Sequence, residues 1–164
     1  MQIKLPAFGA IIPGQGGRLA AIMRGPIADG VELPPYALLV TDMEIESVKW
    51  GEYKDIVGTT SRTDGRTNTA AMLAAGCPAA MRLAELNADG RRDLYIPSLG
   101  ELNAAAGNVP ELFAPEGVYW TSTQLSRGSA FVQCFEDGDS RWYRKGLEFR
   151  VRAVRQIPLE LLIA

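Results

Sequence analysis

The pattern of hydrophobic and polar positions is clearest in the second half of the chain, where it first predicts a helix. Ser98 is followed three residues later by Glu101, the spacing of a capping box, in which each side chain satisfies a backbone donor at the helix start. Three apolar residues then recur at helical spacing on one face: Leu99, Leu102 and Ala106. We therefore expect a helix from Ser98 to about Gly107.

Beyond this helix the pattern changes to short β-prone runs separated by turn residues. These runs are Tyr119–Thr123, Ser129–Glu136, Arg141–Lys145 and Glu148–Gln156. Gly138, which follows Asp137, can take the positive φ that a tight hairpin requires. In the last run, successive residues alternate between the two faces of a strand, which predicts one buried and one charged face. The buried face would carry Phe149, Val151, Ala153 and Arg155, and the charged face Arg150, Arg152 and Val154. Together these runs predict an antiparallel meander.

The middle of the chain predicts two strands and an exposed loop. Tyr36–Val40 is a short apolar run that indicates a buried strand. Ile45–Trp50 alternates in polarity and is expected to be the next strand. Thr59–Asn68 is polar and contains a turn sequence, so we expect it to be exposed unless a partner covers it.

Two short helices should follow that loop. Thr67 or Thr69 is a suitable N-cap for a helix that runs through Ala75, with Gly76 as its C-terminal cap. A second helical segment is expected from Pro78 to about Asn87. With the later helix, this gives an α+β fold with two or three short helices and a mainly antiparallel, twisted sheet.

The first 35 residues form a separate compositional segment, rich in proline and glycine, with little helix. Short strands or extended arms are expected at Ile3–Leu5, Leu19–Met23 and Val31–Leu33. The segment has two readings: extra strands of the domain's own sheet, or an arm that packs on another subunit. We therefore divide the chain into a Pro/Gly-rich arm over residues 1–35 and a domain over residues 36–164.

Composition places the chain among folded domains and removes several classes of partner. Of the 164 residues, 47% are hydrophobic and 22% charged, which is typical of one globular domain. The net charge of -2, with both signs interspersed, favours neither nucleic acid nor an anionic membrane as partner. We expect no export signal and no membrane insertion, because the first residues lack an apolar core and later apolar runs are too short.

The residues that usually carry catalysis are missing. The chain has no histidine, which removes the commonest general base and metal ligand. Cys77 and Cys134 are widely separated and are expected to be buried free thiols. Asp89 and Asp93 lack the spacing of a calcium-binding loop. Phosphate-loop and nucleophile-elbow sequences are absent too, so we predict a non-enzymatic protein without cofactor or metal.

Four sequence elements resemble the Lcl C-terminal domain family, a C-type-lectin-like domain of bacterial surface proteins and many phage proteins. They are Tyr95-Ile96-Pro97-Ser98-x-x-Glu101-Leu102, Tyr119-Trp120-Thr121-Ser122-Thr123, Phe135-x-Asp137-Gly138 and Arg150-Val151-Arg152-Ala153-Val154-Arg155. The elements have the order and approximate spacing of the family and cover about the last two-fifths of the chain. The segment from Tyr36 to Asn87 resembles phage members more loosely. The resemblance implies a C-type-lectin-like fold for residues 36–164.

The sequence lacks the triplets of calcium-dependent sugar-binding lectins and the cysteine pair of the formylglycine-generating enzymes that share this fold. The resemblance therefore implies a bacteriophage virion protein, assembled in the host cytoplasm, on the tail fibre or baseplate. There it would bind a host cell-surface receptor, a glycan or a protein. A capsid or tail decoration protein, in contact with other virion proteins, is the alternative, and a divergent enzyme is a third reading. A homotrimer is expected by resemblance to phage fibre tips.

In phage proteins of this fold the recognition surface lies on and between the late strands. The corresponding residues here offer hydrogen-bonding groups and flat aromatic area: Gln124, Ser126, Arg127, Asp139, Arg141, Trp142 and Tyr143. An arginine beside an aromatic ring suits carboxylate, phosphate or sugar groups. Trp120 and Phe149 are expected to be buried. For Trp142 the sequence favours neither a core nor a surface position.

Overall fold

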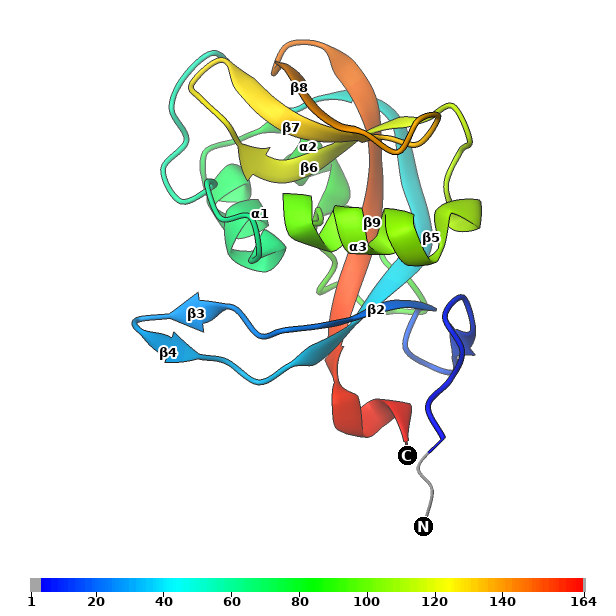
Figure 1. The fold of residues 1–164 in the computed structure, drawn as a ribbon. Coiled ribbons are helices and arrows are strands. Elements are labelled where there is room, and N and C mark those ends of the chain that lie inside the picture. Colours follow the sequence, from blue (N-terminus) through cyan, green and yellow to red (C-terminus); the bar gives the residue numbers. More distant parts are fainter. Residues whose placement is uncertain (1–3, 164) are drawn as a thin grey trace.

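The computed structural model describes residues 4–163 and has an α+β architecture (Figure 1). Within that range it contains three α-helices and a seven-stranded, mostly antiparallel sheet. The helices are α1 (Gly65–Ala74), α2 (Pro78–Leu83) and α3 (Leu99–Asn108), with 3-10 turns η1 (Pro110–Leu112) and η2 (Leu159–Leu162). The expected small α+β fold is therefore confirmed at this level.

The sheet has the strand order β1-β2-β5-β9-β6-β7-β8. Its strands are β1 (Ile11–Ile12), β2 (Gly17–Met23), β5 (Tyr36–Lys49), β6 (Val118–Gln124), β7 (Ser129–Cys134), β8 (Ser140–Arg144) and β9 (Glu148–Pro158). β6 and β9 are parallel where Tyr119 lies opposite Arg150. All the other neighbouring strands of this sheet pair in antiparallel fashion. In Figure 1, β5 and β9 run side by side along the molecule, with β6–β8 at its upper end and β1–β2 at its lower end.

β5 is a single strand of 14 residues, so the expectation of two separate strands is wrong. It pairs with β9 from Tyr36 to Lys49, with irregular register between Val40 and Glu44 and between Ile45 and Val48. Ile45 and Val48 are both buried, although an odd spacing normally places two residues on opposite faces. The irregular register restores the burial that strict alternation would remove.

The N-terminal segment divides between the sheet and a projecting arm. β2 pairs with β5 and β1 pairs with β2, so these residues belong to the main sheet. β3 (Ile27–Ala28) and β4 (Val31–Glu32) pair only with each other. Of the strand expected at Ile3–Leu5, Ile3 lies outside the described residues, and Lys4 and Leu5 are not in a strand.

The helix limits differ from expectation at α1 and α2. Asp64, and neither threonine, caps α1, because its side chain accepts a hydrogen bond from Thr67 N at 3.0 Å. Gly76 follows the helix with φ +76°, as a C-terminal glycine should. α2 ends at Leu83, earlier than expected. Of the exposed loop expected over Thr59–Asn68, the residues from Gly65 onward lie in α1. Thr59 and Asn68 are fully buried, and their side chains donate to Ile56 O and Ser61 O, so the expectation of exposure fails at both.

The expected capping box at α3 is confirmed and is part of a larger buried network. Glu101 is 0% exposed, and its carboxylate accepts hydrogen bonds from the backbone of Gly65 and Ser98. It also accepts from the hydroxyls of Tyr36 and Tyr95. Burial raises the pKa of Glu101, while hydrogen bonds from Tyr95, Ser98 and Tyr36 act in the opposite direction. One carboxylate thus joins the start of α3 to α1 and β5.

The core is centred on two tryptophans that link β5 to β6. Trp50 Nε1 donates to Thr121 O at 2.8 Å, and Trp120 Nε1 donates to Val48 O at 2.9 Å. Both side chains are fully buried, as expected for Trp120. Phe149 packs edge-on against Trp120 but is only half-buried, which corrects its expected full burial.

The late strands follow the predicted runs closely, but β9 is buried on both faces. Val151 and Ala153 pack with Trp120, whereas Val154 packs on the other side with Tyr95. Arg155 is also buried and forms an ion pair with Asp93. The expected charged face therefore covers only the first part of the strand. None of the helices in residues 4–163 has the length and apolarity needed to cross a membrane.

Candidate ligand-binding pocket

The structure does not bring the seven candidate residues into one site. In the β7–β8 ladder, Ser129 lies opposite Arg144 and Gln133 lies opposite Ser140. Arg127 precedes one end of this ladder and Asp139 precedes the other, and each residue of a strand adds about 3.3 Å. Arg127 and Asp139 therefore lie near opposite ends of the β7–β8 ladder.

Gln124 does not contribute to a free surface. Its side chain is 4% exposed, and its amide oxygen accepts hydrogen bonds from Ile56 N at 2.9 Å and Lys145 Nζ at 2.6 Å. Its amide nitrogen donates to Asp55 Oδ1 at 2.7 Å. The expected role in recognition is wrong for this residue, since these bonds anchor the loop after β5 to the end of β6.

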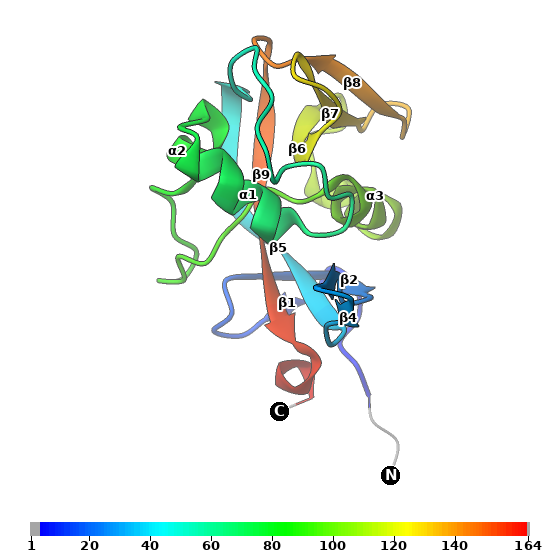
Figure 2. The same cartoon turned by 90° about the vertical axis from the view of Figure 1, so that its left-hand side faces the viewer.

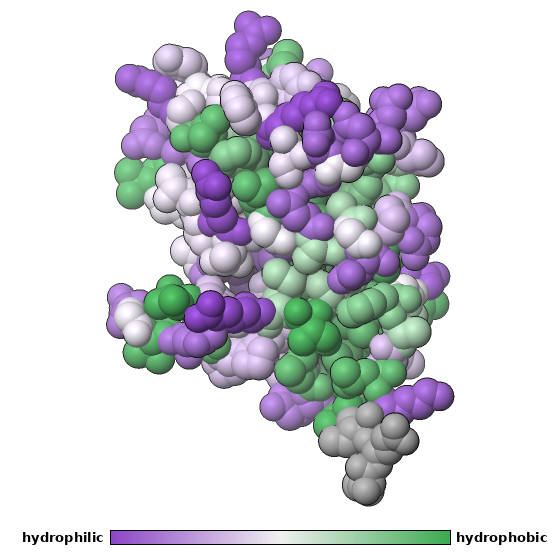
Figure 3. Space-filling model, in the orientation of Figure 1, coloured by the Kyte–Doolittle hydropathy of each residue, from purple (hydrophilic) through white to green (hydrophobic). Residues whose placement is uncertain are grey.

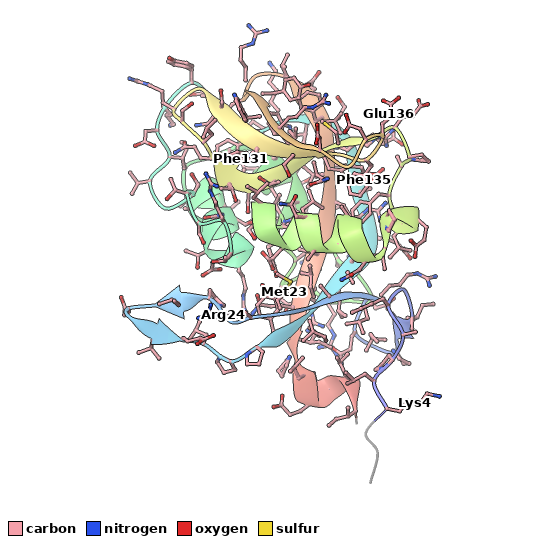
Figure 4. All side chains as sticks on the ribbon, in the orientation of Figure 1. Lys4, Met23, Arg24, Phe131, Phe135 and Glu136 are labelled. Carbon is pink, nitrogen blue, oxygen red and sulfur yellow. The ribbon has the colours of Figure 1, made fainter. Side chains whose placement is uncertain are left out.

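The candidates around β8 form two local arrangements. Asp139 and Arg141 are exposed at the β7–β8 turn, where Arg141 forms ion pairs with Asp137 and Asp139. Trp142 is 59% exposed and contacts Phe131 edge-on, with 6.3 Å between ring centroids. Phe131 is labelled on β7 in Figure 4. Tyr143 is half-buried and packs on Phe149, so it supports the core.

Ser126 and Arg127 line a pocket of about 820 Å³ between three chain segments. The first segment, Lys49–Tyr53, leaves β5, and the second, Ser126–Ser129, connects β6 to β7. The third is the β8–β9 turn, Arg144–Leu147. A cavity of this size matches the usual range for small-ligand sites in proteins.

Tyr53 provides an exposed aromatic surface at this pocket. The residue is 75% exposed, and the Arg127 guanidinium lies 5.4 Å from the centroid of its ring. Gly128 permits this arrangement, because a Cβ at that position would lie 2.5 Å from Tyr53 Cε2. The absence of a side chain at Gly128 thus leaves room for the ring beside the β6–β7 loop.

The pocket lining is basic although the whole chain has a net charge of -2. Four basic residues line it against one acidic residue, Glu52: Lys49, Arg127, Arg144 and Lys145. In the part of the chain from residue 4 to residue 163, none of these four forms an ion pair. Charges of one sign in a concave surface attract ligands of the opposite sign, so the pocket favours an anionic group.

Lys145 is unusual because its ammonium group is buried without a carboxylate partner among residues 4–163. The residue is 1% exposed, and Nζ donates to Lys54 O at 2.8 Å and to Gln124 Oε1. Nζ also lies 4.8 Å from the centroid of the Trp50 ring. Desolvation lowers the pKa of Lys145 to about 8.

The two cysteines lie away from solvent. Cys77 and Cys134 are buried free thiols, as expected, and burial raises the pKa of both, which favours the unreactive protonated form. Within residues 4–163 no three His, Cys, Asp or Glu side chains gather closely enough to hold a metal ion. The arrangement can bind a ligand through charge, hydrogen bonds and an aromatic ring.

Comparisons with known proteins add a likeness of fold. No protein-family model matches the chain, and no curated protein matches it. Among solved structures it is similar to a fimbrial protein from Bacteroides ovatus ATCC 8483, with a TM-score of 0.59 and 10% sequence identity. The match covers 94% of this chain and 48% of that chain, so this chain spans about half the length of its structural neighbour. At such low identity the likeness concerns the fold alone.

Sequence reasoning missed the role of Tyr53 and of the basic residues outside the β6–β7 loop. Tyr53 lies between Glu52 and Lys54, and an aromatic residue within a polar loop was the available signal. Nothing local indicates that this loop meets the β8–β9 turn. That proximity arises because Trp50 N and Gly51 N both donate to Lys145 O.

Proposed function

We propose that the chain is a non-enzymatic component of a bacteriophage virion, on the tail fibre or baseplate, that attaches to a receptor on the host surface. The basic pocket beside Tyr53 and Arg127 carries this proposal. Its unpaired charges and exposed ring suit a carboxylate, phosphate or sugar group of a cell envelope. The receptor is a glycan or a protein that bears such a group. The resemblance of the late sequence elements to the Lcl C-terminal domain family supports the placement on a virion.

The same proposal includes a C-type-lectin-like fold for residues 36–164. It is supported by the long antiparallel pair of β5 and β9, the early helices α1 and α2, and the three late strands β6, β7 and β8. In this fold the late strands and their loops carry the recognition surface. The pocket uses two of these loops, those after β6 and after β8.

A structural role in a virion, as a capsid or tail decoration protein, is the second candidate. It is favoured by exposed hydrophobic residues at the lower end of the molecule: Leu5, Phe8, Ile11, Ile22, Ile27, Val31, Leu33, Leu161 and Ile163. Figure 3 shows hydrophobic surface there and on the projecting arm, and a largely hydrophilic upper end. Exposed apolar area of this kind marks contact with other proteins. The fold likeness to a fimbrial protein is compatible with assembly into a surface structure.

Competition for attachment separates the two roles. Host cells preincubated with the purified chain should bind at least tenfold fewer virions, because the free protein occupies the receptors. Immunogold labelling of intact virions should place the chain at the tail. Labelling of the capsid with no competition would support decoration, and no labelling of virions would contradict both roles.

A further inference from the structure

Lys145 joins the three chain segments that form the walls of the pocket. It lies in the β8–β9 turn, and its backbone N donates to Gly128 O in the β6–β7 loop at 3.0 Å. Its backbone O accepts from Trp50 N at 3.0 Å and from Gly51 N at 3.4 Å, in the loop after β5. Figures 1 and 2 both show the three segments at the upper end of the molecule. One residue of the β8–β9 turn therefore bonds to both neighbouring loops.

The side chain of Lys145 holds the loop after β5 at a second point. Nζ donates to Lys54 O at 2.8 Å, and Lys54 follows Tyr53 directly in the sequence. The backbone bonds to Trp50 and Gly51 lie just before Tyr53. Lys145 thus fixes the chain on both sides of the exposed ring.

Gln124 extends this attachment along the loop. Its Oε1 accepts from Lys145 Nζ at 2.6 Å and from Ile56 N at 2.9 Å, and its Nε2 donates to Asp55 Oδ1. Both partners are buried, Lys145 at 1% exposure and Gln124 at 4%. A hydrogen bond from an ammonium group is stronger than one between neutral groups. A buried lysine–glutamine pair therefore holds the loop from residue 54 to residue 56.

Packing contributes little to the position of Tyr53. The residue is 75% exposed, and its neighbours Glu52 and Lys54 are exposed too. Lys54 N donates to Glu52 O, which lies within the loop itself and does not attach the loop to the rest of the molecule. The bonds to Lys145 and Gln124 are therefore the attachment on which the place of the ring depends.

The ammonium group of Lys145 is buried and engaged with the loop. It bonds to Lys54 O and lies 4.8 Å from the centroid of the Trp50 ring. The other three basic residues of the pocket lining are exposed: Lys49, Arg127 and Arg144. An anionic group can contact these three directly, whereas Lys145 contacts the chain that carries Tyr53.

We propose that Lys145 is a positioning residue of the pocket, which holds residues 50–56 so that Tyr53 stays beside Arg127. Ligand affinity then depends on Lys145 without contact between its ammonium group and the ligand. A loop held in place before binding raises affinity, because it does not have to be ordered when the ligand arrives. This inference rests on the proposed attachment through the pocket.

Hydrogen exchange of the purified full chain measures whether Lys145 holds the loop. Lys145→Met keeps the length of the side chain and removes the donor, so the amides of Lys54 and Ile56 should exchange at least tenfold faster. The amides of β9 should exchange as in wild type, because the release is local. Gln124→Leu removes the shared acceptor and should release the same two amides. Lys49→Met, which removes an exposed ammonium from the same pocket, is the matched control and should leave their exchange unchanged.

Binding of the same purified chains to host cells tests the consequence for the ligand. Lys145→Met and Gln124→Leu should bind at least tenfold more weakly than wild type, because Tyr53 is no longer held. Lys145→Arg keeps a cationic donor and should keep both the slow exchange and the binding. Thermal melts check that each variant is folded.

Three results would overturn the positioning role. They are unchanged exchange in Lys145→Met, unchanged binding of Lys145→Met despite a released loop, and lost binding of Lys145→Arg while its loop stays protected. Failure of wild type to bind host cells would contradict the proposed function, and with it the effect on affinity. The exchange result would still decide whether Lys145 holds the loop.

Discussion

Lys145 is the residue whose environment departs furthest from that of an ordinary surface lysine. The Lys145 ammonium donates hydrogen bonds to Lys54 O and Gln124 Oε1. These bonds offset only part of the free energy lost when the charged group leaves water. The folded state therefore binds this proton less tightly than the unfolded chain does. The pKa of Lys145 is about 8 in the folded chain, whereas the ordinary pKa of a lysine is 10.5.

This difference predicts a pH dependence of stability. Between about pH 8 and pH 10.5 the unfolded chain binds more protons, so the free energy of unfolding contributed by Lys145 rises with pH. The full gain is on the order of 3 kcal/mol. Lys145→Met keeps the length of the side chain and removes the titration. Urea unfolding from pH 7 to pH 10 should show the free energy of unfolding of wild type rising relative to that of the variant. If the two free energies change with pH in parallel, the account is contradicted.

Trp120 is predicted to be among the most costly residues to truncate. Its side chain is fully buried, donates to Val48 O and packs on Phe149. Trp120→Ala should reduce the free energy of unfolding by about 3–5 kcal/mol, because it removes burial and leaves a cavity. Equilibrium denaturation measures this directly. A loss below about 1 kcal/mol would place the residue outside the core.

Burial of single residues was predictable where hydrophobicity alone decides it. Trp120 lies in an apolar β-prone run and is buried. Gln124 is polar and was expected to be exposed, but it is buried because its partners come from the loop after β5 and from Lys145. Such distant hydrogen-bond partners are not visible in local sequence.

At the scale of elements, Glu101 should contribute more to the free energy of unfolding than an ordinary capping residue does. Glu101→Ala would leave the hydroxyls of Tyr36 and Tyr95 and two backbone donors without their acceptor, at a cost of about 3 kcal/mol or more. Ser98→Ala removes one cap and should cost about 1 kcal/mol. Glu85→Ala, at an exposed position, is the control. Urea unfolding giving equal losses for Glu101→Ala and Ser98→Ala would contradict the buried network.

Elements were predictable where a local residue determines their limits. Ser98 and Glu101 start α3, and Gly138 turns between β7 and β8 with φ +77°. β5 was divided wrongly because its irregular register against β9 is set by pairing and not by its own residues. For the same reason the pocket could be predicted only through Ser126 and Arg127, since its other walls come from distant segments.

The whole molecule has two ends of different character. The upper end holds the basic pocket, and the lower end holds the arm and the exposed hydrophobic residues. An attachment protein needs one surface for assembly and another that remains free for its receptor. Repetition of the pocket in the expected homotrimer would raise the overall affinity.

Virion adsorption with a substituted pocket tests the central claim most directly. Arg127→Ala removes an exposed guanidinium at the pocket, and Arg92→Ala removes an exposed guanidinium elsewhere. We predict that Arg127→Ala lowers adsorption to host cells at least tenfold, about 1.4 kcal/mol, with the melting temperature unchanged. Arg92→Ala should adsorb like wild type. Equal adsorption of all three virions, or loss of adsorption only together with loss of thermal stability, would contradict recognition through this pocket.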